Sequence, residues 1–171
     1  IYDFLKRLLD LALSLLIGAL LLPIGIIIAL LIKINSSGPT IYRQKRCGKN
    51  GKLITVYKFR TMMNSENGPL WTESNDSRIT GFGKILRFSH LDEMPQLWNI
   101  VRGDISFTGP RPERVELAEK FKKFPYYEMR HIIKPGLSGW AQISYKPSAS
   151  LEEGYEKLRY DIFYVKNRSF F

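Results

Sequence analysis

Residues 11–32 form an apolar run without a charged side chain, and Pro23 lies near its middle. As a straight helix the run would extend ~33 Å, which is enough to cross the hydrocarbon core of a bilayer. Lys6 and Arg7 precede the run and Lys33 follows it, so both flanks are cationic. Because cationic flanks favour the cytoplasmic side of a membrane, the two ends of the run compete for the same side.

Pro23 offers a solution to this conflict. Proline removes a backbone donor and clashes with the preceding turn, so the helix is expected to kink there. One interpretation is a re-entrant membrane helix, broken at Pro23, that dips into one leaflet and leaves both ends in the cytoplasm. The other is a single-pass anchor that tolerates the proline, because neighbouring groups can satisfy the freed carbonyl. The run by itself is compatible with both.

The run divides the 171 residues into a predicted re-entrant membrane helix at 1–34 and a cytoplasmic or interfacial domain at 35–171. A formal net charge of +10 predicts anionic partners, which are lipid headgroups, phosphorylated substrates or nucleic acid. Cys47 is the single cysteine, which excludes an internal disulfide and fits a reducing compartment. The chain starts at Ile1 rather than Met and stops inside an apolar stretch, so we expect it to be part of a longer protein.

Patterns of apolar residues predict a mainly helical α+β domain with a small sheet. Residues 41–44 and 53–59 alternate like the two strands of a hairpin, with a turn at 48–51. Helical spacing predicts helices at residues 83–89, 94–101, 113–124, 126–133 and 151–165. Residues 140–144 alternate apolar and polar side chains, which predicts a further strand.

Residues 121–127 combine Phe and Tyr with two lysines. Amphipathic segments of this composition can lie in the headgroup layer of a membrane, with the apolar face down and the basic groups in the anionic zone. The alternative is a helix that covers an ordinary soluble core, which is the commoner case for any single helix of this kind. Both placements are compatible with the residues.

Asp92 and Glu93 are adjacent carboxylates in an apolar frame, shortly before Pro95. A carboxylate can ligate Mg²⁺, act as a base, or attack phosphorus as a nucleophile. The plainer explanation is the start of a helix, because Ser89 and Asp92 have capping-box spacing and acids favour the positive end of a helix dipole. Taken alone, the pair is better explained as a helix start.

Basic side chains around the acidic pair favour a chemical role instead. They lie in short segments on both sides of it: Lys58, Arg60, Arg78, Arg87, Arg102, Arg111 and Arg114. Guanidinium forks and a lysine can position a diphosphate and neutralise its charge. Any one of these cations is more often a solvated surface residue, so the argument rests on the group.

Other chemistries lack their motifs. The sequence contains neither a glycine-rich dinucleotide fingerprint nor a P-loop. His90 and His131 lie far apart and have no cysteine partners, which makes a zinc site improbable, and Cys47 is interpreted as structural. The basic and aromatic texture could stack on single-stranded nucleic acid, but no nucleic-acid motif accompanies it, so no nucleic-acid partner is expected.

Four ordered motifs extend over nearly the whole chain. They are VYKFRTM at residues 56–62, LDEMPQLWN at 91–99, GDISFTGPRP at 103–112 and KPGLSGWAQ at 134–142. Together they resemble the bacterial sugar transferase family, the monotopic phosphoglycosyl transferases, and the match is very specific. The continuation at residues 111–114 and the segment 125–127 are more similar to the catalytic domain of long-form members. Those members carry additional membrane helices and a further domain upstream.

The resemblance implies transfer of a sugar 1-phosphate from a UDP-sugar to a polyprenyl phosphate, usually undecaprenyl phosphate, with release of UMP. This is the first membrane step of glycoconjugate assembly, for example of exopolysaccharide, O-antigen or capsule. The resemblance makes Asp92 and Glu93 catalytic, with Asp92 as the covalent nucleophile of a ping-pong reaction and as a ligand of Mg²⁺ (or Mn²⁺). Glu93 would support the metal or assist the leaving group.

By motif position, the phosphate and nucleotide contacts of the family map onto Lys58, Arg87 and Arg111, and the cation cluster adds Arg60. Lys146 stands where many small members have an arginine, so the charge is kept but the bidentate fork is not.

The resemblance also implies a location and partners. It places a monotopic protein on the cytoplasmic face of the bacterial inner membrane, with a re-entrant helix whose Ser-Pro break in small members is here Leu22-Pro23. The implied partners are a UDP-sugar, a polyprenyl phosphate and the anionic lipids of the inner leaflet, and a homodimer is compatible with it. The motifs do not specify the sugar.

Overall fold

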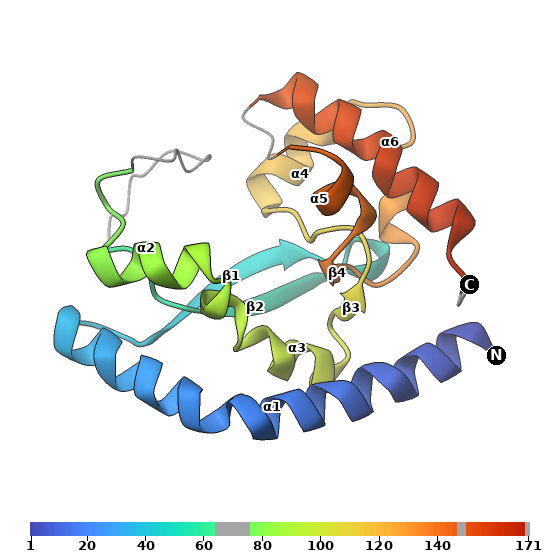
Figure 1. The fold of residues 1–171 in the computed structure, drawn as a ribbon. Helices are drawn as coiled ribbons and strands as arrows, with labels where there is room; N and C mark the ends of the chain where they lie inside the picture. The colour runs from blue at the N-terminus through green and yellow to red at the C-terminus, as the bar shows by residue number, and fades with distance from the viewer. Residues whose placement is uncertain (64–75, 147–149, 170–171) are drawn as a thin grey trace.

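The computed structural model describes residues 1–63, 76–146 and 150–169. Within them the protein is mainly helical, with two small two-stranded sheets, which confirms the predicted α+β class. The long helix α1 (Tyr2–Asn35) runs along one side of the molecule, and the remaining elements lie together on the other side of it (Figure 1).

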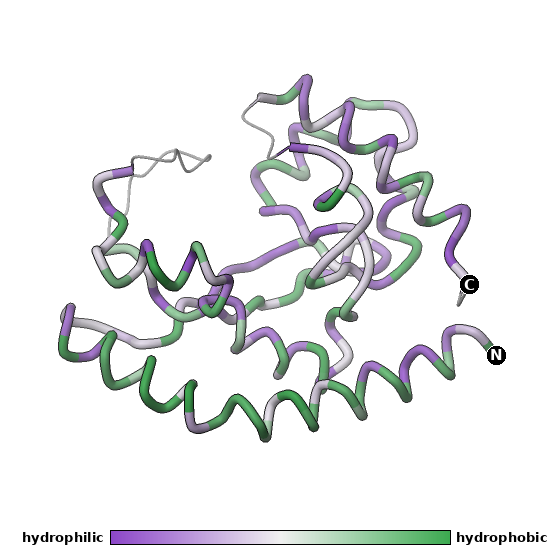
Figure 2. The backbone as a smooth tube through the Cα atoms, in the orientation of Figure 1, coloured by the Kyte–Doolittle hydropathy of each residue, from purple (hydrophilic) through white to green (hydrophobic). Residues whose placement is uncertain are grey.

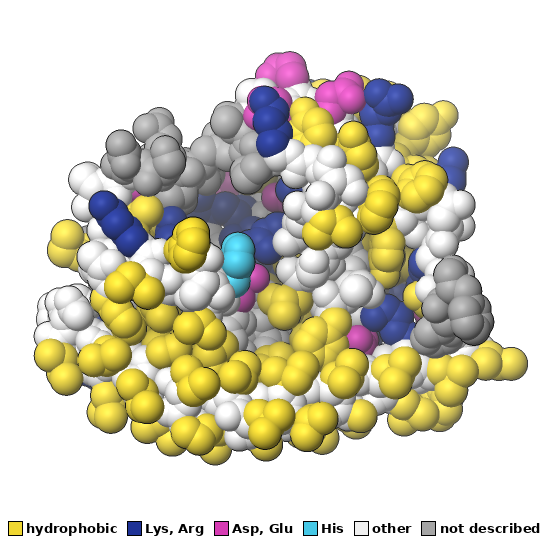
Figure 3. All heavy atoms as spheres, in the orientation of Figure 1, with side chains coloured by type: hydrophobic (Ala, Val, Ile, Leu, Met, Phe, Trp, Pro, Cys, Tyr) yellow, Lys and Arg dark blue, Asp and Glu magenta, His cyan; other side chains and the backbone are white. Residues whose placement is uncertain are grey.

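Helix α1 is long and apolar enough to cross a membrane by length and composition. Only 11% of its most apolar window is buried in the protein, whereas a core helix of a soluble protein is mostly buried. Figures 2 and 3 show the result as a continuous apolar belt along this side of the molecule. The belt contains the exposed residues Leu8, Leu9, Leu13, Leu15, Leu16, Leu20, Leu22, Ile24, Ile26, Ile27 and Leu30.

Pro23 lies inside α1 and does not end it. The helix curves along its length (Figure 1) but continues to Asn35 as one element. A proline removes one hydrogen bond, and the turns on either side keep the helix continuous. The predicted break at Pro23 is therefore not an interruption of the helix, and the re-entrant course in a bilayer stays a prediction.

Both ends of α1 are fastened to the rest of the protein. Near its start, the Arg7 guanidinium donates to the carbonyls of Ile100 (2.5 Å) and Val101 (2.7 Å), at the end of α3 (Gln96–Arg102). Near its other end, Ile28 and Ile32 are buried in a cluster with residues of the sheet and of α2 (Gly81–Phe88). The helix thus exposes one face and packs with the other.

Strands β1 (Ile41–Cys47) and β2 (Leu53–Phe59) form the predicted antiparallel hairpin, with Ile41 opposite Phe59. The turn η1 (Lys49–Gly51) places Asn50 and Gly51 at positive φ, as a tight hairpin connection requires. Strand β1 extends three residues beyond its predicted end.

Strands β3 (Ser106–Thr108) and β4 (Gly136–Ser138) pair in parallel and bring two of the sequence motifs together. The backbones of the two motifs touch here: a Cβ at Gly136 would lie 2.1 Å from the Gly109 nitrogen, and a Cβ at Gly139 would lie 2.2 Å from the Gly109 oxygen. Only glycine fits such an approach, so these motif glycines serve the crossing of two chain segments.

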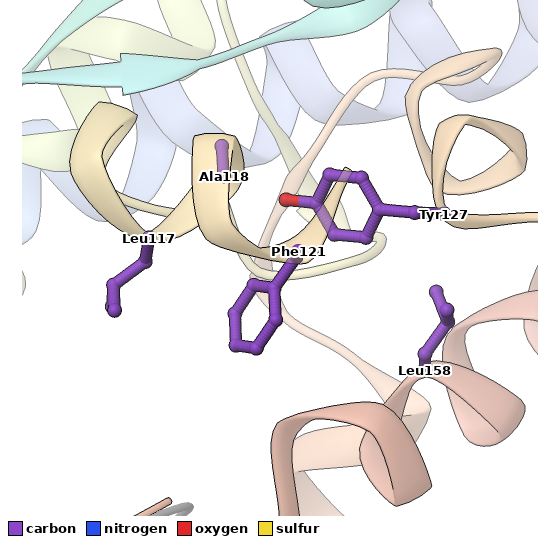
Figure 4. Packing of buried hydrophobic residues seen from close by; sticks show 5 residues of the cluster. All are labelled: Leu117, Ala118, Phe121, Tyr127 and Leu158. Carbon is purple, nitrogen blue, oxygen red and sulfur yellow. The ribbon is translucent and has the colours of Figure 1, made fainter. Parts of the chain in front are cut away.

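The C-terminal elements are α4 (Val115–Phe121), η3 (Tyr127–His131), α5 (Trp140–Ser144) and α6 (Leu151–Asn167). Figure 4 shows side chains of α4, η3 and α6 converging into one core. The core comprises Leu117, Ala118, Phe121, Tyr127 and Leu158. Gly154 lets α6 approach closely, because a Cβ there would lie 2.4 Å from the Phe121 ring.

Two predictions for this part are corrected. Residues 140–144 form helix α5 rather than a strand; Ala141 is its buried residue while Ile143 is exposed, so the alternation does not mark a buried face. The helix predicted at 126–133 is a 3₁₀ helix, η3, of five residues.

The aromatic segment 121–127 belongs to the protein core. Phe121 and Tyr127 are buried, and the ring of Phe124 lies 4.7 Å from that of Tyr155 on α6. Its apolar side chains are largely occupied by internal packing, which favours the soluble-core alternative for this segment. Tyr126, the exposed aromatic residue of the segment, has φ 62 in the turn that begins η3.

Candidate active site

Asp92 and Glu93 lie on the short 3₁₀ turn η2 (Leu91–Glu93) between α2 and α3. His90 precedes it with a left-handed backbone (φ 56), which turns the chain sharply after α2. The Ser89 hydroxyl donates back to carbonyls of α2, among them Ile85 at 2.9 Å, and makes no cap on η2. The capping-box explanation of the acidic pair is therefore wrong.

Asn99 lies on α3, the helix that follows η2, and fastens this part of the chain to the hairpin. Its side-chain oxygen accepts from the Tyr57 amide (3.1 Å) and its amide donates to the Thr55 carbonyl (2.7 Å), so α3 is fastened to β2. Because Asn99 is fully buried, these bonds are shielded from water. Lys58, the neighbour of Tyr57 on β2, is thereby held beside η2.

Glu93 joins two of the predicted phosphate-binding cations. Its Oε1 accepts from Lys58 Nζ at 2.5 Å and from Arg111 Nη2 at 2.8 Å. Burial alone would raise the pKa of Glu93, but the charges and hydrogen bonds of Arg111 and Lys58 lower it to about 2. Burial, and then the charge of Arg111, lower the pKa of Lys58 although Glu93 opposes both. Lys58 and Arg111 share the single carboxylate of Glu93, so the three side chains together carry a net charge of about +1, which can attract an anionic ligand.

Asp92 has a different environment from Glu93. It is 8% exposed, and no hydrogen bond or ion pair joins its carboxylate to any residue within the described ranges. Burial raises its pKa and the charge of Glu93 adds to this, while Lys58 and Arg87 oppose the shift. A carboxylate that is poorly solvated and not bound to a cation is better suited to attack phosphorus than one held in a double ion pair.

A cavity of 670 Å³ opens beside η2, in the size range of sites for small-molecule ligands. Ile17 and Leu21 of α1 form part of its apolar wall, and Glu93 and Arg111 lie on its polar side. Other lining residues are His90, Leu91, Met94, Leu97, Phe107, Leu137, Ser138, Gln142, Ile143, Tyr145, Lys146 and Lys157. Asp92 is not itself a lining residue, but its neighbours in the chain, Leu91 and Glu93, both line the cavity. Figure 3 shows the hollow above the apolar belt, with basic and acidic side chains inside it.

The structure brings together most of the predicted site residues. Arg87 donates from Nε to Thr61 Oγ1 (2.9 Å) and is near enough to act on the pKa of Asp92. Lys146 also lines the cavity, where its side chain is largely exposed and pairs with Glu153 at 2.5 Å.

Arg60 is the exception among the predicted phosphate ligands. Its guanidinium is buried and donates to the carbonyls of Ser36 (2.7 Å) and Ser37 (2.6 Å), just beyond the end of α1. Carbonyl groups after a helix are natural acceptors for arginine. Arg60, the residue after β2, thus anchors the end of α1 to the hairpin, and its partners are not those of Glu93.

A buried network behind the cavity was not predicted. Arg130 of η3 donates to the carbonyl of Arg111 (2.9 Å) and pairs with Asp161 of α6 (2.8 Å) and with Glu113 (3.5 Å). Arg130 therefore holds the backbone of Arg111, the residue whose side chain donates to Glu93. The one sequence signal was Asp161, an acid on the same helix face as the buried Leu158 and Val165.

Lys157 is a second residue that the sequence did not single out. It lines the cavity, as Arg111 does, and the charge of Arg111 acts on it. Burial lowers its pKa, against the charges of Glu113 and Asp161. It adds a cation from α6 to those that β2 and the β3–α4 connection supply.

Asp92 is the residue best suited to hold a divalent cation. The described residues contain no group of three His, Cys, Asp or Glu side chains that could hold a metal ion. Mg²⁺ usually binds through one or two carboxylates together with substrate phosphates, so a complete protein cage is not required. The Asp92 carboxylate fits this role, whereas Glu93 is engaged by two cations.

Comparison with known proteins agrees with the geometry. The bacterial sugar transferase family profile matches residues 1–171. The chain is 39% identical to a UDP-N-acetylgalactosamine-undecaprenyl-phosphate N-acetylgalactosaminephosphotransferase of Aeromonas hydrophila, over 99% of this chain and 41% of the relative. It is 41% identical to a UDP-glucose:undecaprenyl-phosphate glucose-1-phosphate transferase of Escherichia coli (strain K12), over 96% of this chain and 37% of the relative.

A shorter relative is matched over most of its length. The chain is 38% identical to the exopolysaccharide production protein PSS of Rhizobium leguminosarum bv. phaseoli, over 96% of this chain and 87% of that protein. The chain therefore spans less than half of the first two relatives and most of the third. Profile and relatives both confirm the resemblance seen in the four motifs. The chain belongs to the bacterial sugar transferase family.

Proposed function

We propose that this chain transfers a sugar 1-phosphate from a UDP-sugar to undecaprenyl phosphate or a similar polyprenyl phosphate, and releases UMP. The observation that carries the proposal is the composition of the cavity, which joins Ile17 and Leu21 of the apolar helix to Glu93, Arg111 and Lys157. A lipid phosphate has an apolar chain and an anionic head, and a UDP-sugar brings a diphosphate. The named relatives act on the same two kinds of substrate.

In the first step a carboxylate oxygen of Asp92 attacks the β-phosphorus of the UDP-sugar. The bond from this phosphorus to the bridging oxygen breaks, and UMP leaves with the electron pair. The product is a phosphosugar ester of Asp92. Two features support its choice as the nucleophile. No Lys or Arg side chain of the described residues lies within 4.0 Å of this carboxylate, and its pKa is raised.

In the second step an oxygen of the polyprenyl phosphate attacks the same phosphorus. The bond to Asp92 breaks and the carboxylate is restored, so the reaction is ping-pong. The lipid phosphate is already an anion and needs little help from a base. Arg111 and Lys58 contribute by positioning phosphate oxygens and by screening the repulsion between two anions.

Mg²⁺ (or Mn²⁺), when bound with the diphosphate, would neutralise the charge that develops on the leaving UMP. The second oxygen of Asp92 is the protein group we assign to it. Glu93 has a different task. With a pKa of about 2 it stays ionised and has no proton to give to the leaving group. We assign it the orientation of Lys58 and Arg111, which it contacts directly.

UMP release tests this function. With undecaprenyl phosphate present, we expect one member of a panel of UDP-sugars to support many turnovers. Without the lipid, the same sugar is expected to release about one UMP per protein, because the phosphosugar stays on Asp92. Continued UMP release without lipid would identify a phosphohydrolase and contradict the transferase mechanism.

For the location we propose a monotopic protein on the cytoplasmic face of the bacterial inner membrane, with α1 re-entrant and in contact with anionic lipids. The exposed apolar belt and the shared wall between α1 and the cavity support it, since the lipid substrate would enter from the bilayer. The nucleotide substrate would enter from the water side. Together these place the reaction at the membrane surface.

Cysteine labelling tests the topology. In a Cys47→Ser background, single cysteines at Asp3 and at Ser37 are expected to react with a membrane-impermeant maleimide only from the cytoplasmic side. The reason is that a re-entrant helix returns both ends to the leaflet from which it entered. A cysteine at the exposed Lys120 on α4 serves as the cytoplasmic control. Labelling of Asp3 and Ser37 positions from opposite sides would show that α1 spans the bilayer.

A further inference from the structure

A second, smaller cavity lies at the start of α1 and shares no lining residue with the first. Its volume is 90 Å³. Five basic residues line it, against the acids Asp3 and Asp10: Lys6, Arg7, Lys49, Lys134 and Arg168. They come from α1, from the hairpin turn, from the segment before β4 and from the C-terminal end. Nothing in the transferase reaction proposed above uses them.

Two of these cations are neutralised inside the protein. Lys6 pairs with Asp10 at 3.3 Å, and Arg168 pairs with Asp3 at 2.9 Å. The other three are Arg7, Lys49 and Lys134, and none of them has a carboxylate within 4.0 Å among the described residues. The cavity therefore carries unmatched positive charge.

Two of the three unmatched groups converge over Gly103. A Cβ at this position would lie 3.3 Å from the Arg7 guanidinium and 3.3 Å from Lys134 Nζ. The two carbonyls at the end of α3 hold Arg7 in place. Burial lowers the pKa of Lys134, and the charges of Arg7 and Lys49 lower it further, against Asp10 and Asp104. An anion between these groups would relieve the repulsion among them.

We propose that this cavity binds the phosphate of an anionic membrane phospholipid, with Lys49 and Lys134 as its ligands and Arg7 beside them. The inference does not depend on the transferase activity. The cavity is well below the ~300 Å³ of the smallest usual sites for drug-sized ligands, and larger than the ~30 Å³ of one water molecule. It thus suits a single phosphate group rather than a nucleotide.

A lipid is favoured over a free anion because acyl chains have a surface to follow. Phe4, Leu5 and Leu8 are exposed on the same first turns of α1 that supply Lys6 and Arg7 to the cavity. Figure 3 shows charged side chains directly above the apolar belt at this end of the molecule. Headgroup and chains of one phospholipid could therefore be held together, at the depth where α1 enters the membrane.

Native mass spectrometry of the chain in detergent, titrated with phosphatidylglycerol, tests the proposal. The unsubstituted protein is expected to retain one phosphatidylglycerol. The double variant Lys49→Gln and Lys134→Gln is expected to bind it about thirtyfold more weakly, since each cation near an anionic headgroup contributes a several-fold gain. Neither lysine side chain has a hydrogen-bond or ion-pair partner among the described residues, so the fold should persist; the melting temperature measures this.

The matched control is the double variant Lys84→Gln and Lys120→Gln, which removes the same charge from exposed sites on α2 and α4. It is expected to retain the lipid. Equal weakening in both variants would overturn the proposal in favour of general charge attraction. Binding of inorganic phosphate that displaces the lipid at equal concentration would overturn it in favour of a soluble anion. UMP release by the same samples reports separately on the transferase function.

Discussion

Replacement of Asp92 by asparagine is expected to lower the rate of UMP release at least about 1,000-fold and to leave the protein folded. The substitution keeps the size of the side chain and removes the anionic oxygen that attacks phosphorus. Loss of a covalent nucleophile has effects of this size or larger in enzymes that form an acyl intermediate. Because the Asp92 carboxylate has no hydrogen-bond partner among the described residues, little stability depends on it.

Intact-mass spectrometry measures the same step directly. Incubation with the UDP-sugar and without lipid should add one sugar phosphate to the unsubstituted protein and none to Asp92→Asn. The matched control is Asp3→Asn, an exposed acid that pairs with Arg168 outside this cavity and should keep both adduct and turnover. An Asp92→Asn protein with normal product formation would contradict covalent catalysis by this residue.

Replacement of Arg130 by methionine is expected to lower the free energy of unfolding by about 3–5 kcal/mol. Arg130 is 5% exposed, and its loss leaves Asp161 buried without its cation. The surrounding acids raise the pKa of Arg130 although burial opposes this, which shows that the network favours its charged form. The Arg111 carbonyl loses its donor at the same time. Chemical unfolding in detergent, followed by tryptophan fluorescence, measures the effect.

A double variant separates a lost ion pair from lost packing. Arg130→Met with Asp161→Leu removes both charges, and apolar replacement of a whole buried pair is often neutral or stabilising. We expect it to recover most of the lost stability, because Glu113 keeps Lys157 and Arg46 nearby. If the double variant is as unstable as the single one, the role of Arg130 is packing rather than charge. Its UMP release should stay low in either case if Arg130 positions Arg111.

Local patterns predicted the elements that are long or closed by a tight turn. The hairpin, α1 and α6 all lie where the sequence placed them, because their apolar spacing continues over several turns or pairs. The strand predicted at residues 140–144 was wrong because the apolar pattern of a segment of five residues can satisfy both the helical and the strand period. Ser89 was predicted to cap the helix that follows it, but its hydroxyl donates to carbonyls of α2, the helix before it.

Site residues mapped from the family motifs were predicted better than the residue added because of its charge alone. Lys58, Glu93 and Arg111 lie on three different motifs and meet in two hydrogen bonds. Arg60, like Arg111, is an arginine in a motif close to the acidic pair, yet its guanidinium donates to carbonyls just after α1. Sequence cannot separate these cases, since a guanidinium binds carbonyl and phosphate oxygens with the same donors.

The sequence by itself determined the family, the apolar helix and the acidic pair, because each is written in contiguous residues. The tertiary structure decided which cations face that pair, how Arg130 and Lys157 come to stand behind and beside it, and where unmatched charge gathers at the start of α1. The physical reason is that hydrophobic periodicity acts over a few residues, whereas electrostatic fields add up over every element packed around a point.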